Sequence, residues 1–369
     1  MVSDLTQIDL PSRLFDELAG VAEGEPTLAV VTQASSSSQK NDLVTEVFAG
    51  PFAGRVREHG LTPLFCSADE AVLRATRFRA IMLVGETVEE ILPLVTRLRS
   101  DSATVLTPIL AALRRAAKPT YRLLSAGWSR YVDGVLEGEE AMWQPGPALQ
   151  RLRQIDARQW PLQPIDDRFP EASRRQLLIL RWMVTRELDA LEPVRDPASP
   201  LAFSYAPFDL VSDPTADLDA LTRLGLLKRV VVDRVCACPS CDDARLLFRE
   251  VCAACRSTDV RRGDVVHHYA CGHVQSEAFF RRGNGLVCPS CAQPLRHVGI
   301  DYERPATLLY CNGCGHAAAE GTTEARCLAC GATPLAGDVR ERSIHKYLIT
   351  SEGTEAARSS LMPATPSEV

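Results

Sequence analysis

The chain has 369 residues, of which 46% are hydrophobic and 24% are charged, and its net charge is -6. These values are typical of a globular protein with two or three domains, and they exclude disorder of the chain as a whole. A mildly acidic chain also has no global electrostatic attraction to nucleic acids or to anionic membranes.

We interpret the first 25 residues as an N-terminal extension. The segment Met1–Leu10 lacks a basic stretch followed by an apolar core, so we see no signal peptide. No apolar run in the chain approaches the roughly 18 residues that are needed to span a bilayer. We therefore expect a cytoplasmic protein with no membrane contact, in which cysteine thiols stay reduced.

Residues 26–138 alternate between short apolar runs and stretches with helical spacing. β-Branched or apolar runs predict four strands, and Val88–Leu98 has apolar residues three or four positions apart, as in a helix. Strands that alternate with helices predict a parallel, flavodoxin-like sheet with helices on its faces. The predicted strands lie at 27–32, 61–66, 80–84 and 109–113.

Three segments of this domain resemble the receiver domain of bacterial response regulators. SADEAVLRATRFRAIMLVGE (67–86) looks like the second helix and third strand of a receiver. RLRSDSATVLTPILAAL (97–113) looks like the approach to the fourth strand, and LLSAGWSRYVDGVL (123–136) looks like the approach to the fifth. The resemblance covers about 110 residues; the alternative is an unrelated small α/β domain.

The residues that a receiver uses for phosphorylation are missing. The resemblance places Gln33-Ala34, followed by a run of serines, where an acidic pair normally binds magnesium. It places Gly85, next to Glu86, at the phospho-acceptor aspartate, and Asp133-Gly134 near the expected lysine. Without a carboxylate nucleophile and magnesium ligands, phosphoryl transfer has no acceptor and no charge neutralisation. We therefore interpret the domain as a degenerate receiver, or pseudo-receiver.

Residues 139–172 are rich in Pro, Trp and Gln, and we interpret them as a linker that packs through Trp143 and Trp160. Ser173 and Gln176 form a capping-box pattern at the start of a predicted helix. An apolar stripe continues that helix as far as Leu191, and its most economical interpretation is a core helix.

A second helix is predicted from Asp213-Pro214 to Gly225, and Leu226–Val235 then reads as a strand or ribbon. A helix followed by such a ribbon is typical of winged helices, and also of any small α/β connector. We therefore describe residues 173–235 as a helical, winged-helix-like segment.

Twelve of the 13 cysteines lie between residues 236 and 330, and only Cys66 lies outside that range. An odd count and several C-x2-C pairs argue for metal ligands rather than disulfides. Two C-x2-C turns at such spacing form a zinc ribbon, in which four ligands close a tetrahedral site. We pair each turn with its neighbour in sequence, so the first site is Cys238, Cys241, Cys252 and Cys255, and the third is Cys311, Cys314, Cys327 and Cys330.

The middle site has only one C-x2-C pair, and an internal repeat supplies the rest. HYACGH (268–273) aligns with CNGCGH (311–316), which puts His268 in the first ligand position. His267 and His273 are the rival nitrogen ligands; we interpret His273 and His316 as residues that lie beside a metal site or on the surface, without binding the metal. The predicted middle site is His268, Cys271, Cys288 and Cys291.

Two cysteines remain outside these sites. Cys236 stands two positions before Cys238 and could exchange into the first site, but we prefer a partly buried free thiol. Cys66 ends a predicted strand and is best explained as a core residue.

The Cys/His order, with VHHYACGHVQSEAFF, LVCPSCAQPLRHVGIDYERP and YCNGC, resembles the thaumarchaeal output domain. The resemblance runs from about Tyr205 to about Leu348. It implies a zinc-binding module, fused to signalling domains such as receivers, that acts in signal output. The expected architecture is therefore multidomain α/β with three tandem zinc ribbons at 236–350 and a disordered tail at 351–369.

All twelve ligands are used in closed sites, whereas a catalytic zinc keeps one position open. We also find no phosphate loop, nucleophile elbow or H-E-x-x-H motif, and no small-molecule substrate suggests itself, so we expect no enzyme. Residues 236–350 contain thirteen Lys/Arg and twelve Asp/Glu, a balance that favours a protein partner over DNA. A DNA-binding regulator, with Arg261-Arg262 and Arg281-Arg282 as a patch, is the main alternative; a thiol redox or zinc sensor is a weaker one.

Overall fold

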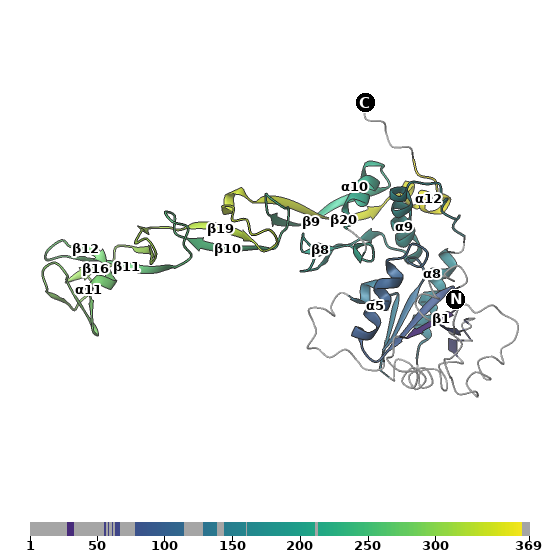
Figure 1. The fold of residues 1–369 in the computed structure, drawn as a ribbon, viewed down its shortest axis with the longest axis horizontal. Helices are drawn as coiled ribbons and strands as arrows, with labels where there is room; N and C mark the ends of the chain where they lie inside the picture. Colours follow the sequence, from purple (N-terminus) through teal and green to yellow (C-terminus); the bar gives the residue numbers. More distant parts are fainter. Residues whose placement is uncertain are drawn as a thin grey trace, which may run out of the picture. The chain divides into compact units, whose positions relative to one another are not determined.

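The computed structural model describes residues 28–32, 55–56, 58, 61, 63–66, 78–113, 128–138, 144–159, 161–210 and 213–363 (Figure 1). Gln33-Ala34, the serine run, Trp143 and Trp160 lie outside these residues. The chain divides into two compact units. The first comprises residues 1–196, 203–233 and 344–369, and the second comprises residues 197–202 and 234–343.

The first unit contains a five-stranded parallel sheet with the strand order β2-β1-β3-β4-β5. Every strand predicted in this domain is present, and the segment that resembles the approach to a fifth strand leads into one. This strand order is that of the flavodoxin-like folds, which include receiver domains. The strands are β1 (Leu28–Thr32), β2 (Pro63–Cys66), β3 (Ala80–Gly85), β4 (Ile109–Leu113) and β5 (Gly134–Glu137).

A helix covers each face of this sheet. Helix α5 (Val88–Arg99) packs Ile91, Val95 and Leu98 against the face that carries Ile81 and Leu83. Helix α8 (Gly146–Gln159) packs Leu149 and Leu152 against the opposite face. The prediction of a linker over 139–172 is therefore wrong for residues 146–159. Their polar composition concealed apolar residues three positions apart, which is enough for one buried helix face.

The ends of β3 and β5 test two of the positions that the receiver resemblance assigned. Gly85 ends β3, and a Cβ atom built on it would lie 2.7 Å from Cγ2 of Ile91, so the close packing of α5 leaves no room for an aspartate side chain. Asp133, in contrast, precedes β5 and lies at its amino end. The position that follows the fifth strand is Gly138, so the comparison of Asp133-Gly134 with the receiver lysine was wrong.

Helix α9 (Glu171–Arg186) begins and ends at other residues than predicted. Its N-cap is Pro170, without a side-chain cap, and Gln176 donates instead to the carboxylate of Asp217. Glu187, in the left-handed conformation with φ of 54°, ends the helix, so Leu191 lies in the next strand. The capping-box prediction was therefore wrong, because tertiary contacts recruited Gln176.

Helix α10 (Thr215–Arg223) follows the predicted signals. The carboxylate of Asp213 accepts a hydrogen bond from the Thr215 amide, and Gly225, with φ of 73°, follows the end of the helix. Strand β9 (Leu227–Ala237) comes next, and it pairs with β20 (Arg340–Ile349) in a three-stranded sheet of order β6-β20-β9. Residues 238–339 are thus inserted between two neighbouring strands.

The prediction of a disordered tail over 351–369 is wrong for residues 351–359. Residues 351–359 form α12 (Ser351–Ser359), whose start is capped by the Thr350 hydroxyl accepting from the Gly353 amide. Ala356 and Ala357 of this helix are buried in a core with Leu180 and Met183 of α9. The small side chains of the segment gave a weak apolar signal, yet they fit a close helix contact.

The second unit is built from nested two-stranded ladders. β10 (Leu246–Val251) pairs antiparallel with β19 (Thr322–Cys327), and β11 (Val260–His268) pairs antiparallel with β17 (Thr307–Cys311). The chain therefore runs out through β10 and β11 and returns through β17 and β19. Beyond β11 the smaller elements are β12 (Val274–Ser276), α11 (Glu277–Phe280), β13 (Arg281–Arg282), β14 (Gly285–Val287), β15 (Pro294–Leu295), β16 (Tyr302–Glu303) and β18 (Ala317–Ala318).

The remaining short elements connect these parts. None of the described helices is long and apolar enough to cross a membrane. The connecting elements are β6 (Ala190–Leu191), β7 (Val194–Arg195), β8 (Phe203–Ser204) and the 3-10 turns η3 (Trp128–Tyr131), η4 (Phe208–Leu210) and η5 (Ala336–Asp338).

Candidate metal centres

The six predicted ligand pairs all lie in turns of one geometry. In each turn the residue after the second ligand donates its amide hydrogen to the carbonyl of the first ligand, as Asp242 does to Cys238 at 2.9 Å. That residue also has positive φ in all six turns, between 60° and 77°. The shared backbone shape directs both ligand side chains to one point. The residues with positive φ are Asp242, Arg256, Gly272, Ala292, Gly315 and Gly331.

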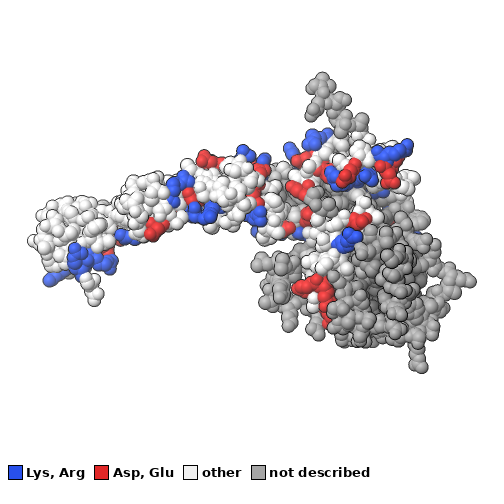
Figure 2. Space-filling view, viewed as in Figure 1, with Lys and Arg blue, Asp and Glu red and all other residues white. Residues whose placement is uncertain are grey.

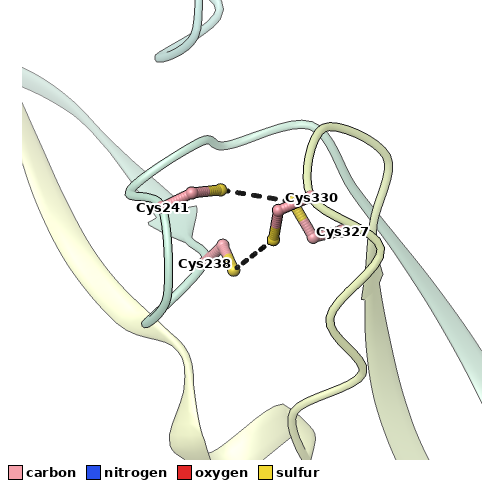
Figure 3. Close-up of side chains that lie close together, drawn as sticks. All are labelled: Cys238, Cys241, Cys327 and Cys330. Atoms are coloured by element: carbon pink, nitrogen blue, oxygen red, sulfur yellow. Dashed lines mark hydrogen bonds between the residues drawn. The ribbon is translucent and has the colours of Figure 1, made fainter.

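The first group of four ligands joins turns that lie far apart in the sequence. Cys238 and Cys241 meet Cys327 and Cys330, with Sγ–Sγ distances of 3.7 Å between Cys238 and Cys330 and 3.6 Å between Cys241 and Cys327 (Figure 3). Two of these cysteines come from the outgoing chain and two from the returning chain.

The second group repeats this arrangement one ladder further along. Cys252 lies 3.7 Å from Cys314, and Cys255 lies 3.6 Å from Cys311, measured between Sγ atoms. The twelve predicted ligands therefore form three groups, but the predicted pairing of neighbouring turns was wrong for two of them, and the groups are nested rather than tandem.

Strand register explains the true pairing. In the β10–β19 ladder Leu246 lies opposite Cys327, and in the β11–β17 ladder Val260 lies opposite Cys311. Each ladder thus brings a turn of the outgoing chain beside a turn of the returning chain. Sequence spacing alone cannot distinguish this arrangement from local ribbons, because both use identical C-x2-C turns.

The distances fit a tetrahedral metal ion. Four sulfur atoms placed about 2.3 Å from a central zinc ion lie about 3.8 Å from one another. The Sγ–Sγ distances of 3.6 and 3.7 Å are close to this value. A disulfide would instead require about 2.0 Å, so the thiols are arranged as ligands rather than as bonded pairs.

The third group combines one histidine with three cysteines. Nδ1 of His268 lies 3.1 Å from Sγ of Cys271 and 3.5 Å from Sγ of Cys291, and Sγ of Cys271 lies 3.6 Å from Sγ of Cys288. His268 is 2% exposed, as expected for the first position of a turn, which is buried in all three groups.

The two rival histidines have other partners. Nδ1 of His267 lies 2.9 Å from the carboxylate of Glu303, and Nε2 of His273 lies 3.1 Å from the amide oxygen of Gln275. In antiparallel strands His267 pairs with Val274 on the side of β11 opposite to His268. The structure therefore groups His268, and neither rival, with the three cysteines.

Backbone amides favour the thiolate form of one cysteine in each four-cysteine group, namely Cys238 and Cys311. The Ser240 amide donates to Sγ of Cys238 at 3.4 Å, and this hydrogen bond helps lower the pKa of Cys238 to about 7. The Cys314 amide has the same effect on Cys311, whose pKa is also lowered to about 7. Because the thiolate is the metal-binding form, the lowered pKa of these two cysteines favours coordination.

Comparison with protein families assigns the part of the chain that carries these groups. Residues 168–349 match the family model of thaumarchaeal output domain 1. These residues belong to that family. The output domain thus includes α9, α10, β9, β20 and the whole of the nested segment, so the helices and the cysteine-rich module that we predicted separately form one family domain.

Solved structures with some similarity include two receivers. The chemotaxis response regulator CheY4 of Vibrio cholerae is 18% identical over 35% of this chain and 99% of its own, with a TM-score of 0.23. The N-terminal domain of a response regulator receiver protein from Methanoculleus marisnigri JR1 is 19% identical over 34% of this chain and 93% of its own, also with a TM-score of 0.23. No curated protein matches. The receiver-like fold rests on the strand order of the parallel sheet.

The two leftover cysteines are not part of the three groups. Cys236 lies in β9 and is exposed, so the prediction of a partly buried thiol was wrong, because β9 is exposed along most of its length. Cys66 lies in β2, as predicted from its apolar run, but its side chain is outside the described part of the chain.

We expect His268→Ala to remove one metal ion per chain from the output domain, because the third group would retain only three ligands. His273→Ala is the matched control and should remove none, since its ring contacts Gln275 and Phe280 instead. Elemental analysis of purified, folded full-length variants measures the difference. Equal metal content in the two variants would contradict the assignment of His268.

Proposed function

We propose that this chain is a non-enzymatic regulatory protein, in which a degenerate receiver-like domain is joined to an output domain that holds three structural zinc ions and binds a protein partner. The nesting of three closed four-ligand groups carries this proposal. Each group already supplies the four ligands of a tetrahedral zinc ion, which leaves no open position for a water nucleophile or a substrate.

A structural role for zinc also follows from how little core the second unit contains. The cluster around the third group is a small one, with Val266, Phe280, Cys288, Leu295 and Tyr302 as its buried members. So small a core supplies little folding free energy, and in comparable modules bound metal supplies most of it. Zinc suits the donor set, since it favours tetrahedral thiolate and imidazole ligands.

The receiver-like domain supports a role in signalling without phosphorylation. The close contact between Gly85 and Ile91 excludes a carboxylate side chain at the end of β3, where a receiver carries its phospho-acceptor. We infer that this domain serves as a docking and positioning domain, in which the surfaces of a receiver are kept and its chemistry is lost.

Charge pairing in the output module favours protein over DNA as the partner. Eight of the thirteen Lys/Arg residues between 236 and 350 form ion pairs with carboxylates. Within the two candidate basic patches, Arg262 pairs with Glu250 and Arg281 with Glu277. Because phosphate contacts need cations that are free of such partners, few remain for a nucleic acid backbone.

One observation favours DNA binding as a second candidate. The order α9, β6, α10, β9, β20, with the sheet β6-β20-β9, is that expected of a winged helix in which residues 238–339 replace the wing. In such a fold the helix that precedes β9 would enter the major groove. That helix is α10, however, and it carries Asp217 and Asp219 but only one cation, Arg223. Its charge is therefore unfavourable for DNA.

Fluorescence anisotropy with labelled duplex DNA tests the choice of partner. We expect the full-length, zinc-loaded protein to show only weak DNA binding at both low and physiological salt. The wild-type chain is compared with Arg223→Glu, a charge reversal at the exposed end of α10. Tight, sequence-selective binding that falls steeply with salt and is lost in Arg223→Glu would overturn the proposal in favour of the winged-helix candidate.

A further inference from the structure

The far end of the nested segment, beyond the third metal group, carries the largest concentration of exposed apolar side chains in the second unit. Five large residues there are between 42% and 73% exposed, and they are Tyr269, Val274, Phe279, Val298 and Ile300. Exposed apolar residues gathered in so small a segment are typical of a binding surface. The side chains of the local core, such as Phe280 and Leu295, are buried, so the exposed ones are not needed to hold the fold.

A small sheet at this end places two arginines on either side of a glycine. In the sheet β13-β14-β15, Arg282 lies opposite Gly285, and Leu286, the residue after Gly285, lies opposite Leu295. Arg296 directly follows Leu295 and the end of β15, so it is the next residue along toward Gly285. Residues opposite one another in neighbouring strands share one face of the sheet. Arg282, Gly285 and Arg296 therefore form one exposed row, which we call the two-arginine face.

The glycine leaves the space between the two arginines open. A Cβ atom built on Gly285 would have no other atom within 4 Å. The two arginine backbones lie two strand spacings apart, which is about 10 Å. A carboxylate that enters this open space can be bound by an arginine with two parallel hydrogen bonds.

The two arginines also lack a carboxylate partner among the described residues, unlike their neighbours. Arg281 and Arg304 both form ion pairs with Glu277, whereas Arg282 donates only to the carbonyl of Arg281. The carboxylate of Asp301 accepts from the backbone amides of Arg296 and His297 rather than from a guanidinium. Figure 2 shows Lys and Arg gathered at this end, with a largely uncharged surface beside them.

We propose that the two-arginine face is the site at which the output domain binds its protein partner, and that the partner supplies an acidic segment with an adjacent apolar side chain. This inference rests on the proposed function. The carboxylate lies between Arg282 and Arg296, and the apolar side chain packs on Phe279 or Val298, which flank the two arginines along the chain. Arginine beside exposed aromatic surface is the composition of binding hot spots. Two unpaired cations are too few for a nucleic acid backbone.

Selection of displayed random peptides on the full-length, zinc-loaded protein tests the site. We expect enrichment of peptides in which Asp or Glu lies next to a large apolar residue. Binding of a selected peptide, measured by anisotropy, should fall about tenfold or more in Arg282→Glu with Arg296→Glu. It should fall similarly in Gly285→Leu, which closes the gap without changing charge. The matched control is Arg326→Glu with Arg340→Glu, two exposed arginines elsewhere in the module, and it should bind as the wild type does.

Two other outcomes would overturn the proposal, and they distinguish a wrong site from a wrong function. Peptides that bind the charge-reversed and glycine variants as tightly as the wild type would place the partner site elsewhere, while the proposed function stands. Failure of any peptide to be selected, together with tight binding of a duplex DNA probe that the Arg282 and Arg296 substitutions weaken, would reject both the site and the protein-binding function. Zinc content is measured for every variant, so that loss of binding is not mistaken for loss of fold.

Discussion

Cys238→Ser combined with Cys327→Ser should lower the zinc content from three ions per chain to two, whereas Cys238→Ser combined with Cys252→Ser should lower it to one. The first pair removes two ligands from one group, and the second removes one ligand from each of two groups. Elemental analysis of the purified proteins gives the counts directly. The single variants are the reference, and each should lose one ion.

The opposite result would support zinc ribbons in which turns that are neighbours in the sequence share one metal ion. If Cys238→Ser with Cys252→Ser retained two ions and Cys238→Ser with Cys327→Ser retained one, the nested grouping would be wrong.

A structural zinc ion contributes on the order of 10 kcal/mol to the folding of a small module. We therefore expect limited proteolysis after chelation to cut within residues 234–343 and to spare the parallel sheet.

Asp133→Asn is expected to lower the free energy of unfolding of the first unit by about 3–5 kcal/mol, because it removes the carboxylate that neutralises two buried arginines. Oδ2 of Asp133 lies 2.9 Å from Arg99, and Oδ1 lies 3.0 Å from Arg186, and the three side chains are at most 4% exposed. The substitution would leave two guanidinium groups buried without a counter-charge among the described residues.

This cluster joins the receiver-like domain to the output domain, which explains the size of the expected effect. Arg99 comes from α5 and Arg186 from α9, and both guanidinium groups contact the ring of Trp182, at 4.9 and 3.8 Å from its centroid. Arg99 also donates to the carbonyls of Val105 and Thr107. Loss of the carboxylate should therefore loosen the contact between the two domains as well as the sheet edge.

Urea unfolding followed by tryptophan fluorescence measures the change, since Trp182 lies in the cluster. Asp166→Asn is the control, because its ion pair with Arg168 lies at the surface, and its midpoint should be close to that of the wild type. An unchanged midpoint for Asp133→Asn would show that the cluster does not stabilise the first unit.

The same cluster predicts a dependence on pH. Burial raises the pKa of Asp133, but the charges of Arg186 and Arg99 more than offset this, so its pKa in the folded protein lies below its ordinary value. A carboxyl with a lowered folded pKa stabilises the fold above its unfolded pKa and loses that contribution as the pH falls. The difference in stability between wild type and Asp133→Asn should therefore be full at pH 7 and shrink below about pH 4.

Features of this protein that depend on neighbouring residues could be predicted from its sequence. Apolar β-branched runs predicted the strands of the parallel sheet, because a buried strand needs such side chains wherever it lies. The C-x2-C turns and the repeat that includes His268 predicted all twelve residues of the three groups, because the backbone shape of each turn is encoded within five consecutive residues. The absence of a carboxylate at Gly85 likewise follows from the residue itself.

Tertiary structure decided the features that depend on distant residues. Which turns share a metal ion depends on the strand register of β10 with β19 and of β11 with β17, and no spacing rule contains that information. Gln176 donates a hydrogen bond to Asp217 instead of capping the helix as predicted. Helix α12 forms from a segment of small residues because those residues pack closely against α9. Asp133 became part of a buried cluster only when α5, β5 and α9 met. In each case contacts between residues far apart in the chain outweighed the local preference.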